Sequence, residues 1–324
     1  MNPIATLLAR TCALMIVALA CSAQAQTQPP IALTLAGLRT IQFLPVQYAQ
    51  KQGYFKREGL DVNLISLNSG PAVISAVASG SAQVGYASPV PIIFARAQSQ
   101  PVRIFDALTM SSPKGDVQWN WLVASEKSGI KSIKDLAGKT IALNTMGGAC
   151  ELQFRENMAK AGVSFDSAKH IVVPYPQMQA ALQLGNADAA CVVEPFRTSI
   201  HVSPEIKGRE LSNGTLADRG KRYPEDILFV RDDWGKANME ALRRIHRGVA
   251  AALADFKKDP TLLRRVMTED FKLSGAVVSL MSNNMEFANV PPAASDIKPL
   301  VEALTRHQML KTAVNPDDVI LQVR

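Results

Sequence analysis

The residue types and spacings that usually carry catalysis do not occur in this sequence. Its four histidines show no metal-ligand spacing, and there is no Gly-x-Ser-x-Gly nucleophile elbow. Gly138-Lys139-Thr140 resembles the end of a phosphate-binding loop, but Ile133 stands where the first glycine of that loop belongs. We therefore expect a protein that is not an enzyme and that uses no metal or cofactor.

Small polar residues and glycines stand where helices are expected to begin. Ser69-Gly70-Pro71 and Ser88-Pro89 open two helices, and Asn144 ends a strand shortly before Gly147. Free N–H groups at a helix start, with the positive end of the helix dipole, favour an anionic group, and glycine lets the backbone approach a ligand closely. Ordinary turns and caps use the same residues, so both roles stay open.

Two charged residues predict opposite ligand charges. Arg39 could offer a forked pair of donors to a carboxylate or sulfonate, or be a solvated surface arginine. Glu194 would repel an anion but pair with an amine or amidine, or serve as an N-terminal helix charge. If both face one cleft, the ligand is zwitterionic or carries a cationic ring. Tyr86 or Trp119 could form one wall for a flat ligand, although core packing explains most aromatic residues.

The N-terminal segment 1–25 has the order of a secretory signal peptide. Arg10 is followed by an apolar run over residues 13–20 and then by Ala23-Gln24-Ala25, after which we place the cleavage. A lipoprotein cleaved before Cys21 is the less favoured alternative, because no branched apolar residue stands three positions earlier. We therefore expect export to the periplasm.

Two cysteines, Cys150 and Cys191, remain beyond that segment. An oxidising compartment could join them in a disulfide, and two buried free thiols are an equal alternative. The composition is otherwise that of a globular protein, with 47% apolar and 19% charged residues. Its net charge of +7 is scattered along the chain, which argues against a nucleic-acid partner.

Short strands alternate with short helices from Ile31 onward, which predicts parallel sheets. The alternation starts a second time near Leu122. Strands are expected over residues 31–35, 62–66, 84–86 and 102–109 in the first run, and over 140–144, 171–173, 189–193 and 226–230 after the restart.

Two α/β lobes follow from this restart. The first lobe takes residues 26–112, the second takes 113–230, and a helical segment over 231–324 completes the first. The chain would cross between lobes near 110–116 and again near 223–233, which gives a two-strand hinge. Because loops at the carboxyl ends of parallel strands line ligand crevices, two facing lobes make a cleft.

Four blocks of sequence carry a specific resemblance. They are Val46-Gln47-Tyr48-Ala49 with Gly53-Tyr54-Phe55-Lys56-Arg57-Glu58-Gly59-Leu60-Asp61-Val62, then Ser79-Gly80-Ser81-Ala82-Gln83-Val84-Gly85, Asp135-Leu136-Ala137-Gly138-Lys139-Thr140-Ile141 and Ala187-Asp188-Ala189-Ala190. In this order they resemble the periplasmic binding proteins of nitrate, sulfonate and taurine ABC importers, with relatives that bind pyrimidine precursors of thiamine. The resemblance implies a type II periplasmic binding protein fold, no catalysis, and delivery to a membrane permease and its ATPase.

The same resemblance implies which loops hold the ligand. They are Arg39-Thr40-Ile41-Gln42, Ser69-Gly70, Ala87-Ser88, Asn144 to Gly148 and Glu194-Pro195. The candidate ligand-binding residues are therefore Arg39, Thr40, Gln42, Ser69, Gly70, Tyr86, Ser88, Trp119, Asn144, Met146, Gly147 and Glu194. The stretch Thr145-Met146-Gly147-Gly148 departs from a sulfonate-type pattern, in which several small hydroxyl residues would stand.

We expect a monomeric solute-binding component of an ABC importer. Its ligand would be a small organic anion or zwitterion, either sulfonate-like, taurine-like or a carboxylate. The alternatives are a binder of a pyrimidine or another flat nitrogenous ring, an enzyme like the thiamine-pyrimidine synthases, and a periplasmic sensor input domain.

Overall fold

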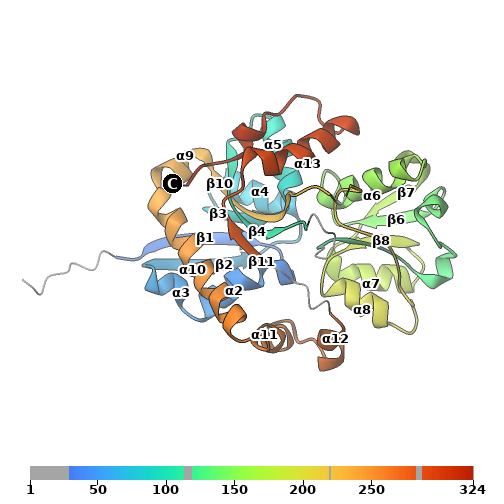
Figure 1. The fold of residues 1–324 in the computed structure, drawn as a ribbon, viewed down its shortest axis with the longest axis horizontal. Coiled ribbons are helices and arrows are strands. Elements are labelled where there is room, and N and C mark those ends of the chain that lie inside the picture. Colours follow the sequence, from blue (N-terminus) through green and yellow to red (C-terminus); the bar gives the residue numbers. More distant parts are fainter. Residues whose placement is uncertain (1–28, 113–118, 219, 282–286, 324) are drawn as a thin grey trace, which may run out of the picture.

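Two β-sheets flanked by helices organise the chain (Figure 1). The computed structural model describes residues 29–112, 119–218, 220–281 and 287–323. The expected signal peptide and its cleavage point lie outside these ranges. None of the helices in the described ranges has the length and apolar character needed to cross a membrane.

The first sheet has six strands in the order β11-β4-β10-β3-β1-β2. They are β1 (Ile31–Gly37), β2 (Leu60–Ser66), β3 (Val84–Ala87), β4 (Val102–Met110), β10 (Pro224–Arg231) and β11 (Phe287–Val290). Leu35 and Ala36 are adjacent in β1, so their side chains point to opposite faces, and both are fully buried. β1 is therefore covered on both sides, as a strand in a sheet with helices on both faces must be.

The second sheet has five strands in the order β7-β6-β8-β5-β9. They are β5 (Trp121–Ala124), β6 (Thr140–Leu143), β7 (Lys169–Val172), β8 (Ala189–Val192) and β9 (Arg209–Asn213). β6 pairs in parallel with β7 and β8, as β1 does with β2 and β3. The sheets are nevertheless mixed rather than wholly parallel as expected. β5 and β10 arrive from the other sheet, start where the parallel strands end, and so run antiparallel to their neighbours.

The chain passes between the two sheets after β4 and again after β9. The first expected passage, near residues 110–116, lies largely in residues 113–118, which are outside the described ranges. The second passage, over residues 214–223, comes earlier than expected. β10 pairs with β3 and β4, so residues 224–230 belong to the first sheet and not to the second lobe range 113–230. A local pattern identifies a strand but cannot show which distant strands it will join.

Helices follow the strands of both sheets. With the first sheet they are α2 (Leu44–Lys51), α3 (Tyr54–Arg57), α4 (Gly70–Ala78) and α5 (Pro89–Ala97), and with the second α6 (Ala149–Lys160), α7 (Tyr175–Gln183) and α8 (Phe196–Val202). Short 3-10 helices are η1 (Ile41–Phe43), η2 (Glu126–Ser128), η3 (Ile133–Leu136), η4 (Phe165–Ser167) and η5 (Pro316–Val319). Several of the longer helices begin directly after a strand, so their N-termini stand at the strands' carboxyl ends.

The C-terminal part of the chain contacts both lobes. It contains α9 (Asp232–Ala237), α10 (Met239–Lys258), α11 (Leu262–Phe271), α12 (Gly275–Leu280) and α13 (Ala294–Arg306), together with β11, which the sequence had not suggested. α10 buries Leu242, Ile245 and Val249, whose spacing places them on one face, against α2 and α3. α13 also reaches α6, where the buried Glu156 accepts a hydrogen bond from Arg306 Nη2 at 2.5 Å.

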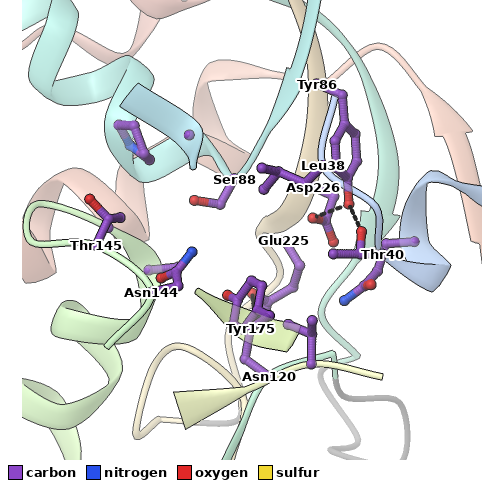
Figure 2. Close-up of a pocket in the computed structure, with 16 residues that line it drawn as sticks. Leu38, Thr40, Tyr86, Ser88, Asn120, Asn144, Thr145, Tyr175, Glu225 and Asp226 are labelled. Atoms are coloured by element: carbon purple, nitrogen blue, oxygen red, sulfur yellow. Dashed lines mark hydrogen bonds between the residues drawn. The ribbon is translucent and has the colours of Figure 1, made fainter. Parts of the chain in front are cut away.

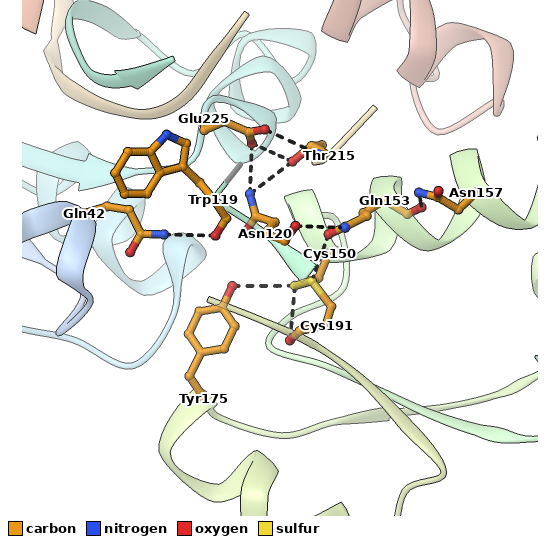
Figure 3. The surroundings of a disulfide bond; sticks show 10 residues. All are labelled: Gln42, Trp119, Asn120, Cys150, Gln153, Asn157, Tyr175, Cys191, Thr215 and Glu225. Atoms are coloured by element: carbon orange, nitrogen blue, oxygen red, sulfur yellow. Dashed lines mark hydrogen bonds between the residues drawn. A yellow bond between two sulfur atoms is a disulfide. The ribbon is translucent and has the colours of Figure 1, made fainter. Parts of the chain in front are cut away.

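A disulfide joins Cys150 in α6 to Cys191 in β8, so of the two alternatives the bonded pair is the one present. Both cysteines are fully buried in the core of the second lobe, and their Cα atoms are 5.5 Å apart. Figure 3 shows the bond beside the Tyr175 hydroxyl, which lies 3.6 Å from the Cys150 sulfur. The disulfide therefore fixes the start of α6 against the sheet.

Reducing this disulfide should lower the free energy of unfolding by about 3–4 kcal/mol, because it closes a loop of 41 residues in the unfolded chain. Urea unfolding with and without a thiol reductant measures the difference. The Cys150→Ala/Cys191→Ala protein is the control and should not respond to the reductant. An unfolding midpoint in the unsubstituted protein that the reductant leaves unchanged would contradict this account.

Candidate ligand-binding cleft

A cavity of about 30 Å³ lies between the two sheets (Figure 2). The first lobe contributes Leu38, Thr40, Gln42, Gly70, Tyr86, Ser88 and Pro91, and the second contributes Asn144, Thr145, Gly148, Ala149, Tyr175 and Val193. Asn120 comes from the end of the first crossing segment, and Glu225 and Asp226 come from the start of β10. This volume has room for about two water molecules. A solute of more than a few heavy atoms therefore requires the lobes to move apart.

The lining residues stand at the carboxyl ends of the parallel strands of both sheets. In the first sheet, Leu38 follows β1 and Ser88 follows β3. In the second, Asn144 follows β6 and Val193 follows β8. Open α/β sheets bind ligands at this edge, and here the edges of two sheets face one cavity.

Four helices begin at the cavity, since Gly70, Ala149 and Tyr175 open α4, α6 and α7, and Ser88 is the N-cap of α5. The positive ends of their dipoles favour a negative group at this place. Prolines in the first turns of α4, α5 and α7 remove part of the free backbone N–H groups. Side chains such as those of Ser88 from the first lobe and Asn144 from the second, which lie across the cavity from Asp226 in Figure 2, must supply other donors.

Glu225 is a buried carboxylate at the start of β10. Its Oε2 accepts hydrogen bonds from Thr215 Oγ1 at 2.7 Å and from Asn120 Nδ2 at 2.9 Å (Figure 3). Burial raises its pKa from 4.5 to about 7; the Thr215 hydrogen bond opposes that rise and the charge of Asp226 adds to it. Glu225 therefore connects the start of β10 to Asn120, just before β5, and to Thr215, just after β9.

Asp226, the next residue, is held from the first lobe. Its Oδ1 accepts a hydrogen bond from the Tyr86 hydroxyl and its Oδ2 one from Thr109 Oγ1, both at 2.7 Å. Thr40 Oγ1 lies 2.9 Å from the same Tyr86 hydroxyl (Figure 2). Burial raises the pKa of Asp226 from 3.8 to about 6, against the lowering effect of these two hydrogen bonds. The carboxylate thus has neutral donors and no cationic partner among them.

Six of the residues proposed from the sequence line this cavity. They are Thr40, Gln42, Gly70, Tyr86, Ser88 and Asn144. Thr40, Ser88 and Asn144 come from loops that follow strands, Tyr86 from the end of β3, Gln42 from η1 and Gly70 from the first turn of α4. Four of the five loops that the family resemblance implied contribute residues to this cavity, and the Glu194-Pro195 loop does not.

Arg39 and Glu194, the proposed charged pair, are not among the lining residues. Arg39 is exposed, and its Nη2 donates to the carbonyl oxygen of Asp270 at 2.8 Å. Glu194 is fully buried and accepts hydrogen bonds from the Thr198 N–H at 3.1 Å and Thr198 Oγ1 at 2.8 Å. Glu194 thus occupies its alternative role at the start of a helix, and Arg39 lies on the surface.

Trp119 and Ser69 have structural contacts in place of cavity contacts. The Trp119 ring is fully buried with its centroid 5.4 Å from that of Phe287, and its carbonyl oxygen accepts from Gln42 Nε2 at 3.3 Å. Core packing therefore explains this tryptophan. Ser69 is the N-cap of α4, and its side chain accepts a hydrogen bond from the Ala72 N–H at 3.4 Å.

Met146 and Gly147 lie beside a second groove, of about 280 Å³, which Ile74 and Phe94 also line. Met146 is 45% exposed. The Gly147 N–H donates to Glu151 Oε2 at 2.7 Å, so this potential anion donor is already engaged. The loop after β6 consequently presents Asn144, Thr145 and Gly148 to the cavity instead.

Sequence reasoning missed Asn120, Tyr175, Glu225 and Asp226. A usable signal existed for the last two, because two consecutive acidic residues precede the apolar run Ile227-Leu228-Phe229-Val230. Acidic residues are rarely buried without a specific partner, so their place at the entry to a core strand was informative. Asn120 and Tyr175 carry no comparable local pattern.

The raised pKa values give a pH-dependent test of the site. A carboxyl that holds its proton more tightly in the folded than in the unfolded state makes stability fall as pH rises between the two pKa values. Asp226→Asn removes the titrating carboxyl and with it this loss of stability. The free energy of unfolding of the variant minus that of the unsubstituted protein should therefore increase by roughly 2–3 kcal/mol from about pH 4 to pH 7.

Urea unfolding of both proteins at several pH values in that window measures the difference. Asp318→Asn is the matched control for the removal of a charge, because Asp318 is exposed and outside the cavity lining. A difference for Asp226→Asn that is constant or falls as pH rises would contradict the assigned burial of this carboxyl.

Two facing α/β sheets with a cavity at their strand ends define the periplasmic binding protein fold, as expected from the sequence. The alkanesulfonate-binding protein SsuA from Xanthomonas axonopodis pv. citri, bound to MOPS, superimposes with a TM-score of 0.78 over 90% of this chain and 99% of that one. The two sequences are 17% identical, so this likeness shows the fold.

A family model described as NMT1/THI5 like matches residues 40–262, and the chain belongs to this family. The nitrate/nitrite binding protein NrtA of Nostoc sp. is 26% identical over 251 residues, which are 72% of this chain and 56% of that protein. The 4-amino-5-hydroxymethyl-2-methylpyrimidine phosphate synthase of Schizosaccharomyces pombe is 28% identical over 121 residues, 37% of this chain and 33% of the synthase. The chain thus spans about half or less of the length of these curated relatives.

Proposed function

We propose that this protein is the solute-binding component of an ABC importer and captures a small organic anion or zwitterion between its lobes. The observation that carries the proposal is the single cavity onto which the strand ends of both sheets and the starts of four helices converge. A ligand that contacts both lobes stabilises the form in which they are close together. The ligand named for the similar SsuA structure, MOPS, carries a sulfonate and an amine.

The proposed partners follow from the same function. The protein would work in the periplasm after removal of residues 1–25, as a monomer, and would release its ligand to a permease driven by an ATPase. The related nitrate/nitrite binding protein supports a role in solute capture. The chain's division into two lobes gives the movement that such a release requires.

A pyrimidine or another flat nitrogenous ring is the second candidate ligand, favoured by the likeness to the pyrimidine phosphate synthase. Tyr86 and Tyr175 line the cavity and would supply apolar ring surface. Binding without chemical change distinguishes this candidate from an enzyme. Mass spectrometry of the pyrimidine recovered after long incubation would reveal any turnover.

Thermal unfolding in the presence of sulfonates, amino acids, aromatic acids and pyrimidines tests the proposal. A ligand at 100 times its dissociation constant should raise the free energy of unfolding by about 2.7 kcal/mol. Absence of any rise across all four classes would contradict solute capture.

Once a solute is found that raises the unfolding temperature, Asn144→Ala should weaken the affinity for it by about 10- to 100-fold. The substitution removes a polar group from the cavity wall. Asn63→Ala is the matched control, since Asn63 is exposed on β2, and it should bind the solute unchanged. Calorimetric titration of the three proteins measures the effect. Equal affinities for all three would place the solute outside the described cavity.

A further inference from the structure

We infer that the ligand carries a protonated nitrogen, an ammonium or amidinium group, that lies against Asp226 and Glu225 at the start of β10. The inference rests on the proposed function and specifies the class of solute. It assigns the recognition of positive charge to two residues that no motif of the sequence had indicated.

The charge balance of the cavity is the first argument. Among the lining residues in the described part of the chain, Glu225 and Asp226 are charged and none is a lysine, arginine or histidine. The hydrogen bonds to Asp226 come from Tyr86 and Thr109, which are neutral. A simple anion would have to enter beside both carboxylates and would be repelled, whereas a cationic group would pair with them.

Unused acceptor capacity is the second argument. An ionised carboxylate has about four lone-pair sites, and the two hydrogen bonds to Asp226 occupy two of them. Gln42 also lines the cavity, is 1% exposed, and its Oε1 has no hydrogen-bond partner in the described chain. A buried acceptor without a donor is costly, and an N–H group of the ligand would satisfy it.

The opposite side of the cavity has the reverse polarity. There the starts of α4, α5 and α6 present the positive ends of their dipoles, with Ser88 and Asn144 as side-chain donors. The helix starts and the carboxylates thus face the same small volume from different elements. A zwitterion with one anionic and one cationic group matches both ends at once.

The orientation of the two carboxylates ties recognition to lobe movement. Asp226 is held by Tyr86 and Thr109 of the first lobe, and Glu225 by Asn120 and Thr215, which flank the second sheet. A cationic group placed between consecutive residues of β10 would contact both of these networks. A cationic group that pairs with both carboxylates would then favour the position of the lobes in which the hydrogen bonds to Asp226 and to Glu225 are both formed.

The test uses matched pairs of solutes in which an ammonium group is exchanged for a hydroxyl group. The probes are taurine with 2-hydroxyethanesulfonate, β-alanine with 3-hydroxypropionate, and 4-aminobutyrate with 4-hydroxybutyrate. Calorimetric titration at pH 8 gives the affinity of the full protein for each. We expect the amine of at least one pair to bind, and to bind at least 30-fold more tightly than its hydroxyl partner.

Asp226→Asn should reduce that preference to threefold or less, because the amide keeps the shape of the side chain and loses its charge. Asp318→Asn, which removes a charge from an exposed position outside the cavity, should keep the full preference. The preference of the unsubstituted protein decides the inference even if Asp226→Asn does not fold. A preference that survives Asp226→Asn would overturn the assignment to this residue.

The outcomes separate this inference from the proposed function. Hydroxyl partners that bind as tightly as the amines, or more tightly, would overturn the inference while supporting solute capture. If no member of any pair binds, and none of the sulfonates, amino acids, aromatic acids and pyrimidines raises the unfolding temperature, the proposed function itself fails and the inference with it.

Discussion

Two consecutive carboxylates, the buried Glu225 and the partly buried Asp226, stand where the chain leaves the second lobe and enters the central part of the first sheet. Burial disfavours their charge, and only neutral hydrogen-bond donors compensate for it. Each carboxylate therefore needs several donors in fixed positions, and these come from different parts of the chain. Satisfying the two groups brings β3, β4 and the segments around Asn120 and Thr215 to one point.

The cavity forms at that point, and its polarity follows from the fold. Parallel strands end at the same edge of each sheet, so the helices that follow them begin there and direct their positive ends to the same place. β10 begins at this edge because it comes from the other lobe, and it brings its acidic residues with it. A negative end and a positive end of the site thus result from strand direction as well as from residue type.

The disulfide between Cys150 and Cys191 lies behind the wall of the cavity that the second lobe forms. It joins the first turn of α6 to β8. Ala149, next to Cys150, and Val193, two residues after Cys191, both line the cavity. Tyr175, whose hydroxyl lies beside the Cys150 sulfur, lines it as well. The cross-link therefore fixes the wall of the site that the second lobe contributes.

Strand positions could be predicted closely from the sequence because alternation of apolar runs with helix starts is a local signal. The expected strands at 84–86 and 102–109 correspond to β3 and β4. β5, β9 and β11 were not among the expected strands. β9 and β11 lie at sheet edges, and all three are defined by pairing with distant strands, which a local pattern does not contain.

The sequence by itself determined the repeated α/β pattern, the family and the loops that converge on the cleft, because each depends on residues close together along the chain. Only the tertiary structure decided which charges share the cavity. Arg39 lies one residue from Thr40 and yet reaches the surface near Asp270, while Glu225 and Asp226 enter from a strand that joins the first sheet late in the sequence. Charge recognition depends on distances through space, and these are set when strands far apart in the chain pair with one another.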